Sequence, residues 1–446
     1  MEHESVGVIA PERRKGSPSQ LLFLWFSANM QLTTIVTGAL AVTLHISLAS
    51  ALVGMIVGNI VGSTIMALHA AQGHRMPAPQ MILSRAQFGL RGSLLVMVLF
   101  TVMYIGFFAS TAVIGGQMLT EVTHIPYGVS LLLLNTLAAL LVYYGQEVIH
   151  RFQRISAYLF LTLFIYLSAT LVAHLVVAHA GPHESFSWPG VLAMASIAIT
   201  WQISYTPYVS DYSRHLQAAT PTWKPFLYAS LGTVTSTTWM MILGGLAAWT
   251  GVNPAHIGNG TFLVVYAAPA LQWTVYTLLL LGIIAVNVFN LYGGFMSTLA
   301  LLPPTRIRLD QRRILVLIAL GAVCTAIAVW GTGNFLDKYA VFLSLLLYFL
   351  IPWSAINLTD FYIVRKAHYD PDGLLGSRPT YGRYNWPTLG VYATAVACEF
   401  TLLRWSAHSL LHNLAWLAGF VVSAVLYYTV SRRYAEPSSE VPKTAH

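Results

Sequence analysis

The chain has 446 residues, of which 56% are hydrophobic, 12% aromatic and only 9% charged, with a net charge of +8. Soluble proteins carry about 25% charged residues, so this chain has too few charges to cover a folded surface of its size in water. The composition therefore excludes an ordinary soluble enzyme, a nucleic-acid-binding protein and a disordered chain, and it predicts an all-α polytopic membrane protein.

Twelve stretches of the chain are long and apolar enough to be transmembrane helices, which need about 20 mostly apolar residues. The eleventh stretch is the weakest because it contains Glu399 and Arg404. In chain order the predicted spans are Leu21–Leu44, Leu48–His69, Ser93–Leu119, Tyr127–Tyr144, Ile155–Val177, Val191–Val209, Phe226–Trp249, Trp273–Leu301, Ile314–Trp330, Tyr339–Val364, Trp386–Trp405 and Leu410–Val430.

The Lys and Arg residues alternate with these spans. If the N-terminus is cytoplasmic, all of the 23 Lys and Arg residues except Lys338 and Arg404 fall in segments on the cytoplasmic side. Cytoplasmic loops of membrane proteins are rich in Lys and Arg, so the pattern predicts an integral protein of the plasma or inner membrane with both termini in the cytoplasm. The basic excess is then a signal of topology, and we expect no nucleic-acid partner.

Four of the predicted spans carry polar residues near their middles. In hydrocarbon, such residues are tolerated where they face other protein or a water-filled cavity. Isolated residues such as Ser168 and Thr325 are explained by hydrogen bonds between helices. The polar sets are Asn29, Gln31, Thr33 and Thr34 in the first span, Ser110, Thr111 and Gln117 in the third, Gln202, Ser204, Thr206 and Pro207 in the sixth, and Asn287 and Asn290 on one face of the eighth.

The polar spans recur at an interval of five, because the first pairs with the sixth and the third with the eighth. A repeat of five helices is odd-numbered, so its second copy crosses the membrane in the opposite direction, as in the inverted repeats of secondary transporters. Pro207 lacks an amide hydrogen and is predicted to break the sixth helix about halfway, whereas Asn, Gln and Thr side chains are expected to satisfy unwound backbone in the first. The predicted organisation is a cytoplasmic tail (1–20), a first five-helix repeat (21–177), an inverted second repeat (191–364), a cytoplasmic loop (365–385), two additional helices (386–430) and a cytoplasmic tail (431–446).

Six strings between residues 20 and 366 occur in the order known from one transporter family. They are WFSANMQ (25–31), PQMILSRAQFGLRG (79–92), the third-span pattern of Gly106, Phe107 and Gly115 to Gln117, SDYSR (210–214), NVFNLY (287–292) and PWSAINLTDFYIVRK (352–366). Together they resemble the nucleobase:cation symporter-1 family, most closely its purine–cytosine permease branch. The resemblance implies a LeuT-like fold and uptake of cytosine, a purine or a related heterocycle with a cation. We expect no enzymatic activity, no cofactor and no metal.

The chemistry of such a substrate agrees with the residues in the spans. A nucleobase is flat, uncharged and edged with alternating hydrogen-bond donors and acceptors. Binding it calls for aromatic faces to stack on and for Asn or Gln amides, which both donate and accept. Neither Lys nor Arg lies near the middle of a predicted span, which disfavours anionic substrates such as phosphates or dicarboxylates.

The resemblance also implies a set of substrate-binding residues. Phe107 occupies the stacking position of the third span, where the family usually has Trp, and Thr111 stands where relatives place an Asn or Gln. On the sixth span the family has an aromatic about nine residues before the Asp of its Asp-Tyr/Phe-Ser-Arg motif. Counting back from Asp211 gives Gln202, with Trp201 just before it and Tyr205 one turn later, and the choice among them stays open. Asn287 and Asn290 match two family asparagines, and Gln31 is a further candidate.

The coupling cation is predicted to be a proton. Sodium-coupled relatives carry Ser and Thr hydroxyls just before the first Asn of the eighth span, but this chain has Ala285 and Val286 there. The proton-coupled branch also lacks these hydroxyls. Sodium coupling stays an alternative, because hydroxyls elsewhere can rebuild a site. The candidate cation site comprises Asn29, Thr33, Thr34 and Ala285.

Three other functions compete with nucleobase uptake. A related transporter of hydroxymethylpyrimidine, allantoin or a hydantoin is the nearest of them. A membrane-embedded enzyme would need a nucleophile with a base or metal ligands at depth, and a channel would need a pore-lining ring. The sequence leaves the oligomeric state and the identity of the heterocycle open.

Overall fold

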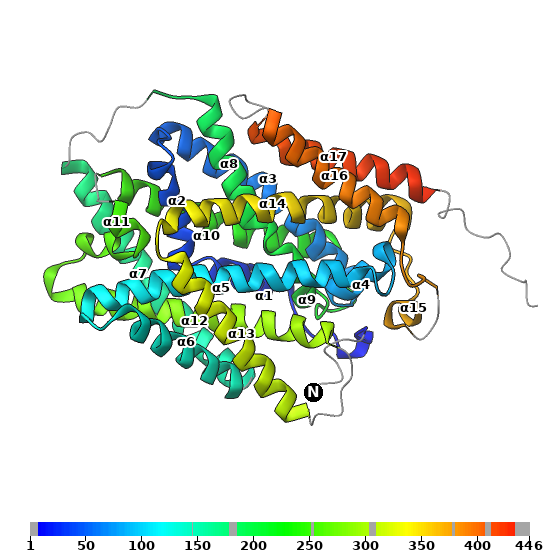
Figure 1. The fold of residues 1–446 in the computed structure, drawn as a ribbon, viewed down its shortest axis with the longest axis horizontal. Coiled ribbons are helices and arrows are strands. Elements are labelled where there is room, and N and C mark those ends of the chain that lie inside the picture. Colours follow the sequence, from blue (N-terminus) through cyan, green and yellow to red (C-terminus); the bar gives the residue numbers. More distant parts are fainter. Residues whose placement is uncertain are drawn as a thin grey trace, which may run out of the picture.

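The computed structural model describes residues 8–144, 146–177, 185–250, 254–302, 309–376, 380–405 and 412–432. Across these ranges the regular secondary structure is helical, and one isolated bridge joins Gly16 to Leu216 (Figure 1). Residues 1–7 and 433–446, which include much of the two predicted tails, lie outside the described residues. So do residues 406–411, where the twelfth predicted span begins.

Every predicted span coincides with a helix or a pair of helices. The long helices are α1 (Pro18–Ala28), α2 (Leu32–Thr43), α3 (Leu48–Arg75), α5 (Ser93–Thr123), α6 (Tyr127–Tyr144), α7 (Gln146–Val177), α8 (Trp188–Ile203), α9 (Thr206–Ser213), α10 (Trp223–Trp249), α12 (Gln272–Leu301), α13 (Leu309–Gly331), α14 (Phe335–Thr359, with a π-helical turn Asp360–Val364), α16 (Trp386–Trp405) and α17 (Ala415–Ser431). Short helices are η2 (Pro11–Arg13), α4 (Gln80–Phe88), α11 (Pro254–Gly258), η3 (Thr261–Tyr266), η4 (Pro269–Leu271), α15 (Pro371–Leu375) and η6 (His412–Leu414).

Length and apolar composition support most of the twelve spans. In the described part of the chain, nine helices meet both criteria, and the bent pair α1 and α2 makes a tenth span. The other two predicted spans are α8 with α9, where the apolar helix has only 16 residues, and α16, which carries Glu399 and Arg404. The sixth and eleventh crossings therefore stay predictions.

The first span is broken as expected. α1 ends at Ala28, α2 begins at Leu32, and the two axes differ by 55°. Side-chain amides take over from backbone donors here: Asn29 Nδ2 donates to the Trp25 carbonyl at 2.7 Å, and Gln31 Nε2 donates to the Ala28 carbonyl at 2.8 Å. The joint is therefore stable without a proline because its freed carbonyls are hydrogen-bonded.

The sixth span is broken too, but slightly earlier than predicted. α8 ends at Ile203 and α9 begins at Thr206, so Pro207 lies in the first turn of α9 rather than in the break. A proline in a first helical turn loses no hydrogen bond, since that amide has no helical partner anyway. Hydroxyls compensate the break: Ser204 Oγ donates to the Trp201 carbonyl and Thr206 Oγ1 to the Ile203 carbonyl, both at 2.6 Å.

The two broken spans lie between closely packed helices. α3 packs along α8 and α9, while α1 and α2 pack along α10. A Cβ at Gly58 of α3 would lie 2.4 Å from the Ala195 carbonyl oxygen of α8, so glycine is required for this approach. The C-terminal helices α16 and α17 pack against each other and against α14 along one edge of the molecule (Figure 1), away from the two joints.

Candidate functional site

A cavity lies between the two helix joints. About 120 Å³ of it is open to the centres of water-sized spheres, which is room for several waters, since one water needs about 10–15 Å³ by this measure. The cavity includes Leu24 and Ser27 of α1 and Ser156 near the start of α7. Its other lining residues are Ala28, Met30, Gln31 and Thr33, Phe107 and Thr111, Ala157 and Phe160, Trp201, Ser204, Tyr205 and Tyr208, and Ala285, Val286, Phe289 and Asn290.

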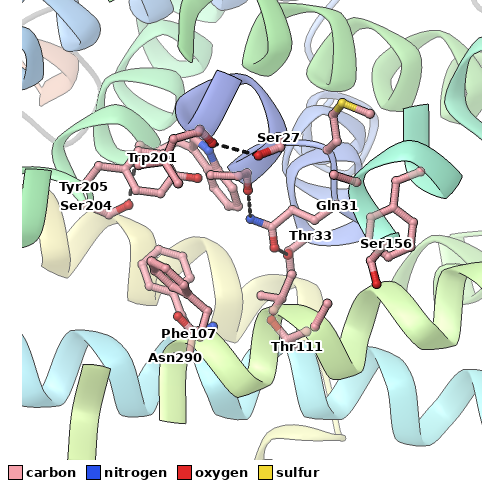
Figure 2. Close-up of a pocket in the computed structure, with 18 of the residues that line it drawn as sticks. Ser27, Gln31, Thr33, Phe107, Thr111, Ser156, Trp201, Ser204, Tyr205 and Asn290 are labelled. Carbon is pink, nitrogen blue, oxygen red and sulfur yellow. Dashed lines mark hydrogen bonds between the residues drawn. The ribbon is translucent and has the colours of Figure 1, made fainter. Parts of the chain in front are cut away.

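Aromatic rings form much of the cavity wall. Phe107 of α5 meets Trp201 of α8 edge to face, with ring centroids 5.8 Å apart at 83°. Trp201 and Tyr205 are 6.3 Å apart at 87°, and Tyr205 and Tyr208 are 5.8 Å apart at 86°. Edge-to-face contacts of this kind fix ring orientation, so the cavity has rigid apolar faces. Figure 2 shows Trp201, Ser204 and Tyr205 reaching it from one side and Ser156 from the other.

A few polar groups in the wall have unused hydrogen-bonding capacity. Thr111 Oγ1 and Ser156 Oγ are buried without a hydrogen-bond partner among the described residues. Asn290, 8% exposed, lines the cavity and makes no hydrogen bond to the rest of the described chain. Gln31 uses part of its amide in the joint, since Thr33 Oγ1 donates to its Oε1 at 2.8 Å. Buried polar groups generally have partners, so these atoms are positioned to meet a polar ligand or water.

The described wall of the cavity carries no charged side chain. Its described lining residues include no Asp, Glu, Lys, Arg or His. Across the described residues no group of three or more His, Cys, Asp or Glu side chains is placed to hold a metal ion. An ionised solute would have to lose its hydration without a countercharge, which is costly. The arrangement therefore favours an uncharged, flat solute with polar edges.

Six of the eight residues predicted to bind substrate line this cavity. Gln202 does not: its Nε2 donates to Asn59 Oδ1 at 2.9 Å and its Oε1 accepts from Thr233 Oγ1 at 2.6 Å, so the amide points behind the wall. Asn287 is 1% exposed and also lies outside the lining, with an unpartnered Oδ1. The residues that the cavity brings together are Gln31, Phe107, Thr111, Trp201, Tyr205 and Asn290.

The four residues of the candidate cation site are divided by the structure. Thr33 and Ala285 line the cavity. Thr34 is fully buried in α2 outside the lining, and its hydroxyl has no partner among the described residues. Asn29 is fully buried behind the aromatic wall, and Trp201 Nε1 donates to its Oδ1.

Several lining residues were not predicted from the sequence. Tyr208 follows Tyr205 by three residues and Phe289 follows Ala285 by four, so helical spacing contained a signal for both. Ser156 and Phe160 belong to α7, an otherwise ordinary apolar span. Their position depends on how α7 packs against α12, which the sequence pattern does not reveal.

The side of the cavity near α2 and the end of α5 is closed by apolar contacts. We call α11 and η3 together the cap. Phe262 and Leu263 of the cap are fully buried. The backbone of Gly260 lies so close to Leu32 of α2 that a Cβ there would be 2.5 Å from its Cδ2. The cap thus seals this side by packing.

On the opposite side, which carries residues 8–17, polar contacts join the helix ends. His69 of α3, Gln80 and Gln87 of α4, and Asn357 and Asp360 of α14 form a chain of buried hydrogen bonds that we call the basal network. Gln80 Nε2 lies 3.0 Å from His69 Nδ1 and donates to Asn357 Oδ1 at 3.3 Å. Asn357 Nδ2 donates to Gln87 Oε1 at 3.2 Å, and Gln87 Nε2 donates to Asp360 Oδ2 at 2.6 Å.

Asp360 ends the basal network and is fully buried. Tyr427 OH of α17 and Tyr369 OH donate to its two oxygens at 2.7 and 2.8 Å, and Arg365 Nε lies 3.0 Å from Oδ1. Arg365 follows the π-helical turn, and the nearby Asp360 carboxylate raises the pKa of its guanidinium although burial acts in the other direction. This carboxylate therefore joins α4, α14 and α17.

The N-terminal segment also belongs to this side. Arg14 Nη2 donates to the His74 carbonyl at 2.7 Å, and its Nε donates to the Leu216 carbonyl at 2.8 Å. Gly16 N donates to the His215 carbonyl at 2.8 Å, and Gln217 N returns a bond to the Gly16 carbonyl at 3.0 Å. The segment that precedes α1 is thereby attached to the end of α3 and to the loop after α9.

Comparison with known sequences gives a consistent result. A family model described as "Permease for cytosine/purines, uracil, thiamine, allantoin" matches residues 8–429. YxlA of Bacillus subtilis (strain 168), named as a purine-cytosine permease, is 34% identical over 443 residues, which cover 97% of this chain and 96% of that protein. The purine-cytosine permease fcyB of Emericella nidulans is 24% identical over 384 residues, covering 81% of this chain and 73% of that protein.

Comparison with solved structures concerns the fold. The inward-facing conformation of Mhp1 matches with a TM-score of 0.77 at 18% identity, covering 97% of this chain and 94% of that chain. Mhp1 in a closed conformation with bromovinylhydantoin bound, described as a nucleobase-cation-symport-1 family transporter, matches with a TM-score of 0.75 at 16% identity, covering 98% and 96%. These likenesses confirm the LeuT-like helical fold that the sequence predicted.

Proposed function

This chain belongs to the nucleobase:cation symporter-1 family, whose members are described as permeases for cytosine/purines, uracil, thiamine and allantoin, and from that premise we propose that it imports cytosine or a purine by cation symport. It is an integral membrane permease rather than an enzyme. The observation that carries the proposal is the uncharged, aromatic-walled cavity between the two joints, with Asn290 in its wall. A neutral heterocycle is the solute that such a cavity can desolvate cheaply.

In the proposed complex the base stacks on Phe107 or Trp201 and presents its edge to Asn290. Stacking of this kind contributes about 0.5–1.5 kcal/mol beyond burial of area. The Asn290 amide has both donors and an acceptor available, which matches the alternating edge of a cytosine or purine. Thr111 Oγ1 and Ser156 Oγ, both unpartnered and buried, are the next candidates for polar contacts with the base.

We propose the proton as the coupling ion. Sodium bound at such joints needs several oxygens, among them carbonyls of unwound backbone. Ala285 offers no side-chain oxygen, and the oxygen of Asn29 already accepts from Trp201 and Tyr205. These two positions support proton symport over the alternative of sodium symport.

The proposed topology orients the two sides of the cavity. With both termini in the cytoplasm of a cell whose plasma or inner membrane holds the protein, the cap faces outside and the basal network faces inside. The cavity includes Leu24, Ser27 and Ser156, which lie on the basal side of the joints. Alternating access would then expose the same cavity to each side in turn.

Uptake into proteoliposomes tests this function. Purified protein should accumulate labelled cytosine, adenine or hypoxanthine in a saturable manner, and a panel of unlabelled heterocycles including allantoin, a hydantoin and hydroxymethylpyrimidine should rank below the true substrate. Accumulation should rise as external pH falls, collapse with a protonophore and ignore replacement of sodium by choline. Strict sodium dependence at constant pH would contradict proton coupling. Competition only by allantoin or hydantoins would replace the nucleobase as substrate.

A further inference from the structure

Asn29 lies where side chains of the two joints meet through hydrogen bonds. It is the first residue after α1, and it is fully buried. It does not line the cavity, although its neighbours Met30 and Gln31 do. A buried asparagine next to a binding cavity but outside its wall has no direct use for substrate, so its own partners indicate its role.

All four hydrogen-bonding positions of the Asn29 amide are occupied. Its Oδ1 accepts from Trp201 Nε1 at 2.8 Å and from Tyr205 OH at 2.7 Å. Its Nδ2 donates to the Trp25 carbonyl at 2.7 Å and to Thr233 Oγ1 at 3.2 Å. A carboxamide has two donor hydrogens and two acceptor lone pairs, so no capacity is left for a cation or a substrate.

The two acceptor bonds reach the rings that face the cavity. Trp201 is the last aromatic of α8, and Tyr205 lies in the break between α8 and α9. The break is short, since Ser204 N still donates to the Thr200 carbonyl at 2.9 Å and Tyr205 N donates to the Gln202 carbonyl at 3.2 Å. A buried indole N–H and a buried phenol O–H each need a hydrogen-bond partner, so the two rings need a partner beside the cavity. Asn29 supplies it from the joint of the first span.

We propose that Asn29 is a positioning residue that holds the indole of Trp201 and the phenol of Tyr205 in the cavity wall and couples the two helix joints without an ion. The inference rests on the proposed function, because the rings face a substrate only if the cavity binds one. It changes the role of Asn29 from a candidate cation ligand to a structural tie between the joints.

The same network accounts for the position of Gln202. Thr233 Oγ1 accepts from Asn29 Nδ2 and donates to Gln202 Oε1 at 2.6 Å, and Gln202 Nε2 donates to Asn59 Oδ1 at 2.9 Å. Gln202 is therefore held on the far side of α8 from the cavity. With Gln202 turned away, Trp201 is the ring that this part of α8 presents to the cavity.

The test is a double-mutant cycle that separates positioning from direct contact. Asn29→Leu removes the amide at similar volume and leaves the donors of Trp201 and Tyr205 buried without a partner. Trp201→Phe combined with Tyr205→Phe removes both donors, so Asn29→Leu in that background leaves nothing unpaired on the two rings. A matched control is Asn135→Leu, which removes another buried amide, one that donates to Thr325 Oγ1 at 2.9 Å outside the cavity wall.

Equilibrium binding of labelled cytosine or hypoxanthine, whichever the wild type binds more tightly, is the first measurement. Asn29→Leu should weaken it about 10- to 100-fold in the wild-type background and less than about 3-fold in the doubly substituted background. Asn29→Asp, whose carbonyl oxygen still accepts from both rings, should stay closer to the wild type than Asn29→Leu. Asn135→Leu should leave affinity within about 2-fold.

Two binding results overturn the inference. Equal weakening in both backgrounds would show that Asn29 contacts substrate or cation itself. Unchanged affinity of Asn29→Leu would show that the rings need no tie. Thermal unfolding of each variant identifies any that fail to fold, and Asn29→Asp then carries the comparison.

A second measurement needs no ligand and distinguishes failure of this inference from failure of the proposed function. The fluorescence difference between each protein and its Trp201→Phe counterpart isolates Trp201 among the 12 tryptophans. Loss of the indole hydrogen bond should shift that difference spectrum to shorter wavelength in Asn29→Leu but not in Asn135→Leu. An unshifted spectrum overturns the inference, whereas a wild type that binds none of the bases contradicts the proposed function alone.

Discussion

The cap and the basal network join helices on opposite sides of the cavity by different physical means. The cap buries Phe262 and Leu263, and its η3 packs on α7, α10 and α12. These contacts separate by exposing apolar area, at a free-energy cost that grows gradually with that area. The basal network cannot separate without unpairing buried amides and the Asp360 carboxylate, each at a discrete cost. We infer that the helices joined by the cap can separate gradually. The helices joined by the basal network separate in discrete steps, each of which needs new hydrogen-bond partners for the buried groups.

The largest expected effect is on the basal side. Asp360→Ala removes the acceptor of four side chains and leaves Arg365 partly buried without its carboxylate. Breaking a buried ion pair in this way costs about 3–5 kcal/mol. We expect a large fall in the thermal unfolding midpoint in detergent. Asp360→Asn, which keeps one oxygen acceptor, is the control. Equal stability of Asp360→Ala and wild type would show that the basal network is not held by discrete polar contacts as we infer.

A second effect concerns the cavity that lies between the cap and the basal network. Asn290→Ala should weaken binding of the base by about 1–3 kcal/mol, because one hydrogen bond to a buried neutral partner is lost. Asn287→Ala, one turn earlier and outside the wall, should have a smaller effect. Titration of labelled base into purified protein measures both. Wild-type affinity in a folded Asn290→Ala variant would place the base elsewhere.

A third effect weakens the cap alone. Gly260 has φ +72°, and an added Cβ would approach Leu32, Ile114 and Met118 within 2.5 to 3.1 Å. Gly260→Ala should cost about 1–2 kcal/mol for the left-handed backbone, with further loss of fit against flexible side-chain ends. Thiol labelling of a reporter cysteine measures this loss. The reporter is Ile257→Cys, at a fully buried position of α11, and it should react faster when Gly260→Ala is also present. Unchanged labelling would show that the cap is anchored elsewhere.

The smallest effect is expected at the rim of the cap. Glu121 lies 3.3 Å from His256 Nδ1, and their side chains are 37% and 46% exposed. Such surface pairs contribute about 0–1 kcal/mol, so Glu121→Gln should change the unfolding midpoint and the Ile257→Cys labelling rate only slightly. High salt should erase the remaining difference from wild type. An effect as large as that of Gly260→Ala would show that the cap is held by charge rather than packing.

Much of the fold followed from the sequence because lipid imposes a simple rule on spanning segments. The apolar runs indicated the helices, and the amides of Asn29 and Gln31 indicated the joint of the first span, which has no proline. Pro207 indicated the second break but not its position, because a proline fits the first turn of α9 without loss. The sequence also gave no indication of the cap, whose short helices are not periodic enough to stand out.

The candidate site was partly predictable. The resemblance to the family implied Phe107, Thr111 and Asn290, and all three line the cavity, whereas Asn287, implied in the same way, lies outside the wall. Counting back nine residues from Asp211 reached Gln202, but the cavity is lined by Trp201, Ser204, Tyr205 and Tyr208, which follow one another at helical spacing, so Gln202 lies on another face. Trp201 and Tyr205 therefore face the cavity instead. Ser156 depends on packing between distant helices, which no local pattern reports.

The attachment of Gly16 to His215 and Gln217 has a consequence for biosynthesis. The two strands of this contact are separated by about 200 residues of chain, and at about 5–20 residues per second a ribosome needs about 10–40 s to make them. For that interval α1 is already synthesised while its partners beyond α9 do not exist. The segment before α1 therefore lacks this attachment until about half of the protein has followed it.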